Sequence, residues 1–146
     1  MNRILFLDFD GVLHPAGAGC VKFSQLGLLA DFLREPEQAD IRIVVSSTWR
    51  QIHSLNRLRG LFPADLQARI VGCTPVLDEY DTDFERGEEI EAWLEERPRG
   101  AAWVALDDDA GGFPARLKPH VVFTDGHMGL TTEDVASLRS RLAGAT

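Results

Sequence analysis

The fold is decided by the stretch Ile4-Leu5-Phe6-Leu7-Asp8-Phe9-Asp10-Gly11-Val12-Leu13, an apolar run that ends in two carboxylates and a glycine. Consecutive large apolar residues are typical of a strand buried on both faces, which in α/β proteins lies inside a parallel sheet. Ligands bind beyond the carboxyl ends of such strands, where Asp8 and Asp10 fall. Positions two apart point to the same side, so both can hold one hard cation, through a side chain or a backbone carbonyl. An acidic end that only caps the next element is the alternative, but a cap needs just one acid.

Strand and helix patterns alternate along the rest of the chain. Apolar runs predict further strands over 41–45, 70–72, 102–106 and 121–123. Short connections and the absence of repeats then predict an α/β protein with a doubly wound, five-stranded parallel sheet. Right-handed crossovers place the carboxyl ends of all strands at one edge. We therefore expect these polar residues to meet there: Asp8, Asp10, Ser46, Asp107 and Asp108.

A helix is predicted after the second strand from apolar residues at helical spacing. Its inward positions would be Ile52, Leu55, Leu58 and Leu61. The arginines of this segment, Arg50, Arg57 and Arg59, would then lie mostly on a solvated face. Arg50 is nearest the strand end and is the candidate among them for a substrate contact.

Helix caps can also be predicted from residue type. Ser24 is expected to cap the helix that follows the first loop, and Thr82 or Asp83 the helix before the fourth strand. Thr131 or Thr132 is expected to cap the last helix. These hydroxyl and carboxylate side chains can accept hydrogen bonds from the free N–H groups of a first helical turn.

Composition limits the classes of function. The chain has 146 residues, 45% of them hydrophobic, which suits a single domain over 1–146. It contains no apolar run long enough to span a bilayer and no signal-peptide pattern, so a soluble, cytoplasmic protein without membrane contact is expected. Cys20 and Cys73 lack metal-ligand spacing and are expected to be buried small apolar residues. The net charge of -8 opposes broad binding to nucleic acid, although it leaves room for a local basic site.

The ordered motifs resemble those of the haloacid dehalogenase-like (HAD) superfamily of phosphotransferases over nearly the whole chain. The first motif stands here as Asp8-Phe9-Asp10-Gly11-Val12-Leu13, and the hydroxyl that ends the second strand as Ser46. Arg86 fits the basic residue near a helix start, and Asp107-Asp108 fits the acidic pair. The run Ser-Ser-Thr-Trp-Arg and the tail Asp-Gly-His-Met-Gly-Leu-Thr are similar to a small capless branch found fused to RNA-repair enzymes. The resemblance implies a Rossmann-like HAD fold without a separate cap domain.

The resemblance also implies roles. Asp8 would attack phosphorus to give an aspartyl phosphate, and Asp10 would protonate the leaving oxygen and later deprotonate water. Mg²⁺ would be held by Asp8, the Asp10 carbonyl, and Asp107 or Asp108, with Arg86 adding positive charge. Ser46 would donate a hydrogen bond to a phosphoryl oxygen.

Several alternatives stay open from the sequence. Ser46 could be only a helix cap with Ser47 in its place at the substrate, and Lys118 is a rival for the role of Arg86. Asp125 and His127 follow the fifth strand and fit either turn chemistry or substrate contact.

Two other functional classes compete with a phosphatase. A response-regulator receiver domain has a similar sheet, but it places its phosphorylated Asp after the third strand, where this chain has Gly72-Cys73-Thr74. A catalytically inactive binding module of the same fold is the other. The expected partner is a phosphorylated substrate, either a small phosphoester or a nucleic-acid end that carries a 3′-phosphate.

Overall fold

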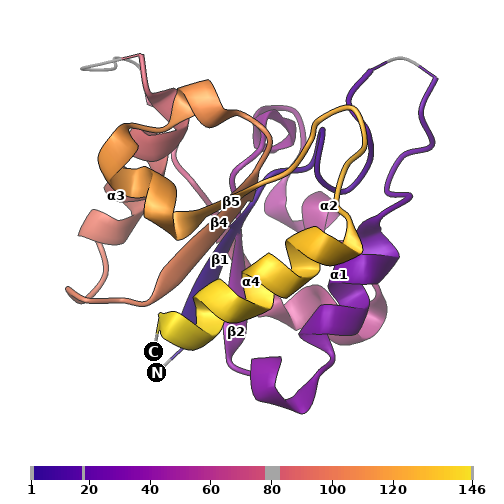
Figure 1. Ribbon diagram of the computed structural model, residues 1–146, viewed down its shortest axis with the longest axis horizontal. Coiled ribbons are helices and arrows are strands. Elements are labelled where there is room, and N and C mark those ends of the chain that lie inside the picture. Colours follow the sequence, from indigo (N-terminus) through magenta and orange to yellow (C-terminus); the bar gives the residue numbers. More distant parts are fainter. Residues whose placement is uncertain (1, 18, 78–82, 146) are drawn as a thin grey trace.

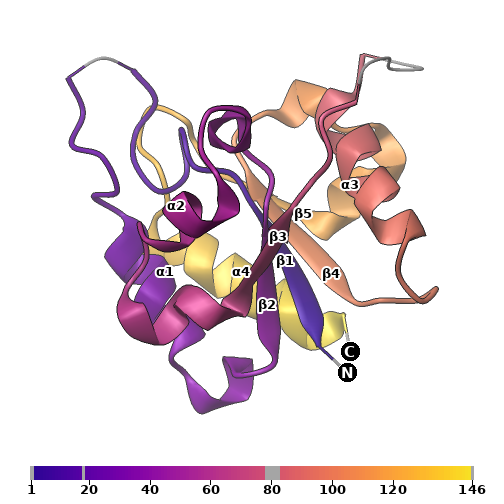
Figure 2. The ribbon, with the colours of Figure 1, turned by 180° about the vertical axis from the view of Figure 1, so that it is seen from behind.

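The computed structural model describes residues 2–17, 19–77 and 83–145. Its centre is a parallel sheet in the order β3-β2-β1-β4-β5 (Figures 1 and 2). The strands are β1 (Arg3–Leu7), β2 (Ile41–Val45), β3 (Ile70–Cys73), β4 (Trp103–Asp107) and β5 (Val121–Phe123). The predicted α/β class and five-stranded parallel sheet are confirmed, and the first stretch does form the central strand.

Helices cover both faces of the sheet. They are α1 (Leu26–Leu33), α2 (Leu55–Arg59), α3 (Glu85–Glu95) and α4 (Thr132–Gly144). Short 3-10 helices span Pro36–Gln38, Thr48–Gln51, Ala64–Arg69, Ala110–Gly112 and Ala115–His120. Helices α1, α2 and α4 lie on one face and α3 on the other (Figures 1 and 2). The sheet is therefore doubly wound, as the alternating pattern predicts.

The alternation of side chains along β1 explains why this strand is apolar throughout. Leu5 and Leu7 pack with the apolar face of α1 and α4, whereas Ile4 and Phe6 pack against α3. On the second side Phe6 meets the rings of Trp93 and Trp103 edge to face, at centroid distances of 5.4 and 5.5 Å. A strand with two buried faces fixes its register, and this register places Asp8 directly beyond its carboxyl end.

Strand pairing brings the functional segments together. β1 pairs with β2 on one side and with β4 on the other, so residues after these three strands are neighbours. The order of the strands reverses between β1 and β4, the position at which open α/β sheets form their ligand crevice. The start of β1 and the end of α4 lie together, away from this crevice (Figure 1).

The structure corrects some local predictions. α1 begins after Gln25 without a side-chain cap, and Ser24 instead donates to the Gln25 side chain. α3 begins after Phe84, so Asp83 is not its cap, and Thr82 lies outside the described residues. The last helix does have the expected cap, because Thr131 and Asp134 form a reciprocal capping box.

The segment after β2 departs most from the prediction. α2 is only one turn long and starts at Leu55, so Ile52 lies before it and is 80% exposed. Leu58 is buried as expected. The two cysteines are free and half-buried rather than fully buried. None of the described helices is long and apolar enough to cross a membrane.

Candidate active site

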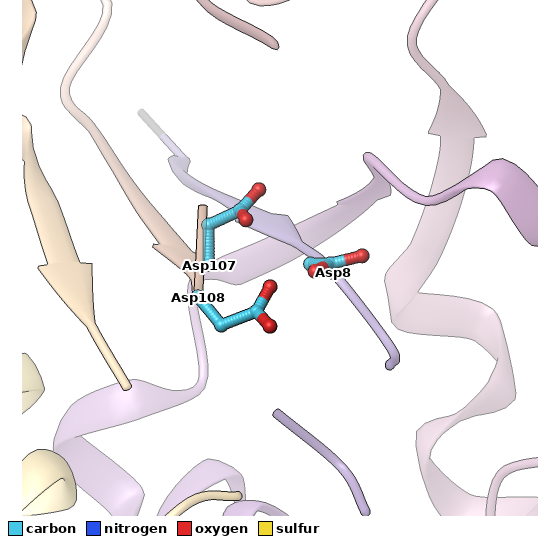
Figure 3. A group of neighbouring side chains, drawn as sticks. All are labelled: Asp8, Asp107 and Asp108. Atoms are coloured by element: carbon cyan, nitrogen blue, oxygen red, sulfur yellow. The ribbon is translucent and has the colours of Figure 1, made fainter. Parts of the chain in front are cut away.

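Three carboxylates converge at the carboxyl ends of β1 and β4. Asp8 follows β1, Asp107 ends β4 and Asp108 comes next, and each offers an oxygen within 4.8 Å of the other two (Figure 3). Asp8 and Asp107 are buried and Asp108 is partly exposed. Hard divalent cations prefer carboxylate oxygens in such an arrangement, and the donor set fits Mg²⁺.

Two glycines allow Asp108 to reach this cluster. A Cβ on Gly11 would lie 2.1 Å from Asp108 Oδ2, and a Cβ on Gly126 would lie 2.5 Å from the same atom. Gly11 also has φ = 80°, a conformation that favours glycine. The loops after β1 and β5 therefore approach Asp108 more closely than any side chain would permit.

The cluster carries more negative charge than its surroundings favour. Burial and the neighbouring Asp107 raise the pKa of Asp8 far above the ordinary carboxylate range. Burial likewise raises the pKa of Asp107, against the opposing effect of Arg86. Both shifts disfavour the charged carboxylates, so a divalent cation bound here would relieve the repulsion.

Arg86 supplies the positive charge of the site from the first turn of α3. Its guanidinium lies 3.7 Å from Asp8 Oδ1 and 3.5 Å from Asp107 Oδ2, and it donates to the Ser46 carbonyl at 2.7 Å. Gly87 follows it, and a Cβ there would lie 2.8 Å from Pro114. This close packing fixes the start of α3, and with it Arg86, against the site.

Ser46 follows β2 and presents a buried hydroxyl. Its backbone N–H continues the ladder by donating to Leu7 O at 2.8 Å, which places the residue beside the end of β1. The hydroxyl is buried and has no hydrogen-bond partner among the described residues. Ser47, by contrast, accepts from the backbone N–H of Trp49 and so caps the following 3-10 helix. Of the two serines, Ser46 is the one with a hydroxyl available for a ligand.

Asp10 is bound by two side chains. Its Oδ1 lies 2.6 Å from His14 Nε2, and its Oδ2 accepts from Trp49 Nε1 at 3.1 Å. Burial opposes the charged form, but these hydrogen bonds outweigh it and hold the pKa of Asp10 below its ordinary value. The Asp10 side chain remains 45% exposed, so it faces the open edge of the sheet.

Arg50 is placed differently from the prediction of a substrate contact. Its guanidinium forms an ion pair with Glu89 at 2.6 Å, and both side chains are almost completely buried. It also donates to the carbonyls of Ser47 and Thr74. Arg50 thus ties the loops after β2 and β3 to α3, and this structural role replaces the expected contact with substrate.

The remaining candidates are not part of the cluster. Lys118 precedes β5, so it lies toward the opposite edge of the sheet and cannot replace Arg86. Asp125 accepts from the backbone N–H of His127, the turn chemistry considered from the sequence, and both residues are exposed. Arg59 donates to the Ile70 carbonyl, so the three arginines after β2 do not form a continuous free basic track.

Sequence reasoning missed His14 and gave no role to Trp49. His14 stands in a segment rich in Pro, Gly and Ala, which predicts an exposed loop, yet its side chain is fully buried. Its spacing of four residues from Asp10 was the only available signal.

Comparison with known families agrees with this geometry. The family model described as the HAD domain in Swiss Army Knife RNA repair proteins matches residues 4–135. That range includes all the residues described in this site, and the family implies a phosphatase-like hydrolase. No curated protein matches the sequence. The chain belongs to the family of HAD domains found in Swiss Army Knife RNA repair proteins.

Proposed function

We propose that this protein is a Mg²⁺-dependent phosphomonoesterase that acts through an aspartyl phosphate on Asp8. The observation that carries the proposal is the group of three carboxylates, Asp8, Asp107 and Asp108, beside the guanidinium of Arg86. A carboxylate nucleophile and a phosphate repel each other, so this chemistry requires positive charge at the point where they meet.

Asp8 attacks phosphorus as the bond from phosphorus to the leaving oxygen breaks. The negative charge of a bound phosphoester would raise the pKa of Asp10 from its lowered value in the free protein. Asp10 then gives its proton to that oxygen, and the alcohol leaves neutral. Asp10 then accepts a proton from the water that cleaves the acyl phosphate and regenerates Asp8. The orientation of Asp10 by His14 and Trp49 suits a group that transfers a proton twice at one place.

Arg86 and Ser46 contact the phosphoryl group. The guanidinium offers several N–H donors in a fixed plane, and the Ser46 hydroxyl is a buried donor with no partner among the described residues. Asp8, Asp107 and Asp108, with the Asp10 carbonyl, would hold Mg²⁺, which neutralises phosphoryl charge when bound. Ser47 has its hydroxyl engaged with Trp49 N–H and supports the loop rather than the substrate.

The family description supports a phosphorylated nucleic-acid end as the substrate. Between β1 and β2, and between β2 and β3, the described residues form only short helices and loops and no separate cap domain. A site without a cap would admit a bulky ester. The arginines after β2 do not support this assignment, because Arg50 and Arg59 are engaged within the protein.

A screen of phosphoesters tests the proposal. We expect Mg²⁺-dependent release of phosphate from nitrophenyl phosphate and from 3′-phosphorylated oligonucleotides, abolished by EDTA. A higher kcat/KM for the oligonucleotide than for the matching mononucleotide, with an advantage that shrinks as salt rises, would support a nucleic-acid end. Equal values at low salt would leave a small-molecule phosphatase.

A further inference from the structure

A buried imidazole contacts the one acid of the motif Asp8-x-Asp10 that lies outside the three-carboxylate cluster. His14 has no exposed surface, and its Nε2 lies 2.6 Å from Asp10 Oδ1. Trp49 reaches the second oxygen from the 3-10 helix after β2. Two segments far apart in the sequence therefore hold the two oxygens of a single carboxyl group.

The hydrogen bonds of His14 define which nitrogen carries the proton. The backbone N–H of Phe23 donates to Nδ1 at 3.1 Å, so Nδ1 is an acceptor and bears no proton. The proton of the neutral ring is then on Nε2, and Nε2 donates to Asp10. The imidazole is fixed as a donor that points at the carboxyl group.

The surroundings hold this ring in one orientation. The rings of His14 and Phe23 form a T-shaped pair at a centroid distance of 5.2 Å and an interplanar angle of 88°. The chain from Asp10 to His14 forms a closed loop, in which Gly11 N–H donates to His14 O at 2.9 Å. An apolar side chain could fill the same space, and burial of a polar ring is costly unless its nitrogens are paired. Both nitrogens of His14 are paired, which favours a role for the hydrogen bond itself.

We propose that His14 is a positioning residue that aims the carboxyl group of Asp10 at the leaving oxygen, with Trp49 as its second support. The proposal rests on the proposed function, because it takes Asp10 as the proton donor. Each carboxyl oxygen can take part in more than one hydrogen bond, so two N–H donors still leave a position for the proton that is transferred. The plane of the Asp10 carboxyl group is then fixed. The proton moves from Asp10 to the ester oxygen as the bond from that oxygen to phosphorus breaks and the bond from Asp8 to phosphorus forms.

This role predicts an effect that depends on the leaving group. A nitrophenolate leaves without much help from an acid, whereas an alkoxide needs the proton during bond breaking. A misplaced Asp10 should therefore slow alkyl esters far more than aryl esters. A general loss of folding would slow both by the same factor.

The test compares kcat/KM for nitrophenyl phosphate and an alkyl phosphate at saturating Mg²⁺. This parameter reports the steps up to departure of the leaving group, so the later attack of water does not enter. The variants are His14→Leu, which removes the donor, and His14→Gln, whose side-chain amide keeps one. Trp49→Phe removes only the second donor and keeps an aromatic ring, so it carries the test if His14→Leu does not fold.

We expect His14→Leu to lose at least about tenfold more on the alkyl than on the aryl ester, a part of the roughly 10²–10⁴-fold that a general acid contributes. His14→Gln should recover most of that difference, and Trp49→Phe should show a smaller loss of the same kind. In an Asp10→Asn background, His14→Leu should add no further selective loss. Equal losses on both esters in folded variants would overturn the positioning role while the phosphatase assignment stands. A wild-type protein that cleaves neither ester would overturn both the positioning role of His14 and the phosphatase assignment.

Discussion

Gly126 and Asp108 are packed so closely that the loop after β5 limits where the Asp108 carboxylate, a proposed Mg²⁺ ligand, can lie. A Cβ at Gly126 would lie 2.5 Å from Asp108 Oδ2. The same loop is joined to the first motif, since Thr124 donates its hydroxyl proton to the Gly11 carbonyl at 2.7 Å. The loop after β5 thus shapes the site through its backbone, although none of the three clustered carboxylates comes from this loop.

Gly126→Ala should therefore displace Asp108. We expect the Mg²⁺ concentration for half-maximal activity to rise by about tenfold, the usual cost of disturbing a group that supports a metal ligand. Gly27→Ala is the matched control, because a Cβ at Gly27 in α1 meets nothing within 4 Å. A Gly126→Ala protein with an unchanged Mg²⁺ requirement would show that Asp108 does not bind the metal.

Metal and phosphoryl contacts can be separated by titration. Asp107→Ala or Asp108→Ala should raise the Mg²⁺ requirement, whereas Arg86→Ala should lower kcat by about a hundredfold even at saturating Mg²⁺. The reason is that Arg86 would contact the phosphoryl group, whereas its guanidinium cannot bind the metal. A normal kcat for Arg86→Ala would mean that a group other than Arg86 supplies the positive charge at the phosphoryl group.

The metal-free protein should lose stability as pH rises. Burial and Asp107 raise the pKa of Asp8, so the folded state binds this proton more tightly than the unfolded chain. The unfolding free energy then falls with pH from about 4 upward, through neutrality. In EDTA we expect the melting temperature to decrease over this range, with a shallower slope for Asp8→Asn. Added Mg²⁺ should reduce the slope in the wild type, since the cation favours the charged carboxylate. An equal slope for Asp8→Asn in EDTA would contradict the raised pKa.

The buried ion pair of Arg50 and Glu89 should matter for stability. Arg50→Ala should lower the unfolding free energy by about 3 kcal/mol, because the Glu89 carboxylate loses its buried cationic partner. The exposed pair of Arg34 with Asp65 provides the comparison, and Arg34→Ala should melt close to the wild type. Denaturant unfolding of Arg50→Ala and Arg34→Ala measures the two losses of unfolding free energy. A small effect of Arg50→Ala would return Arg50 to the candidates for substrate contact.

Much of this architecture could be predicted from local pattern. The run at β1 indicates a central strand because both faces are buried, and the parallel order then brings Asp8, Asp107 and Ser46 to one edge. Arg86 could be located through the resemblance to the HAD superfamily, in which a basic residue lies near the start of the helix before the fourth strand.

The failures of prediction share a tertiary cause. Arg50 is expected on a solvated face, but its partner Glu89 comes from α3, a contact that helical spacing cannot reveal. His14 is buried because Phe23 and Trp49 fold over it from later segments, so its own neighbours in sequence predict a loop. Ile52 is exposed because the segment forms a 3-10 helix before α2 in place of one longer helix.

Turnover by Asp8→Asn tests the central claim most directly. The substitution keeps the size of the side chain and removes the charged nucleophile, so the purified, folded variant should hydrolyse nitrophenyl phosphate at least about 100-fold more slowly than the wild type at saturating Mg²⁺. Acid-quenched wild type given labelled substrate should in addition carry phosphate that hydroxylamine releases, and Asp8→Asn should carry none. Wild-type turnover by Asp8→Asn would contradict the account.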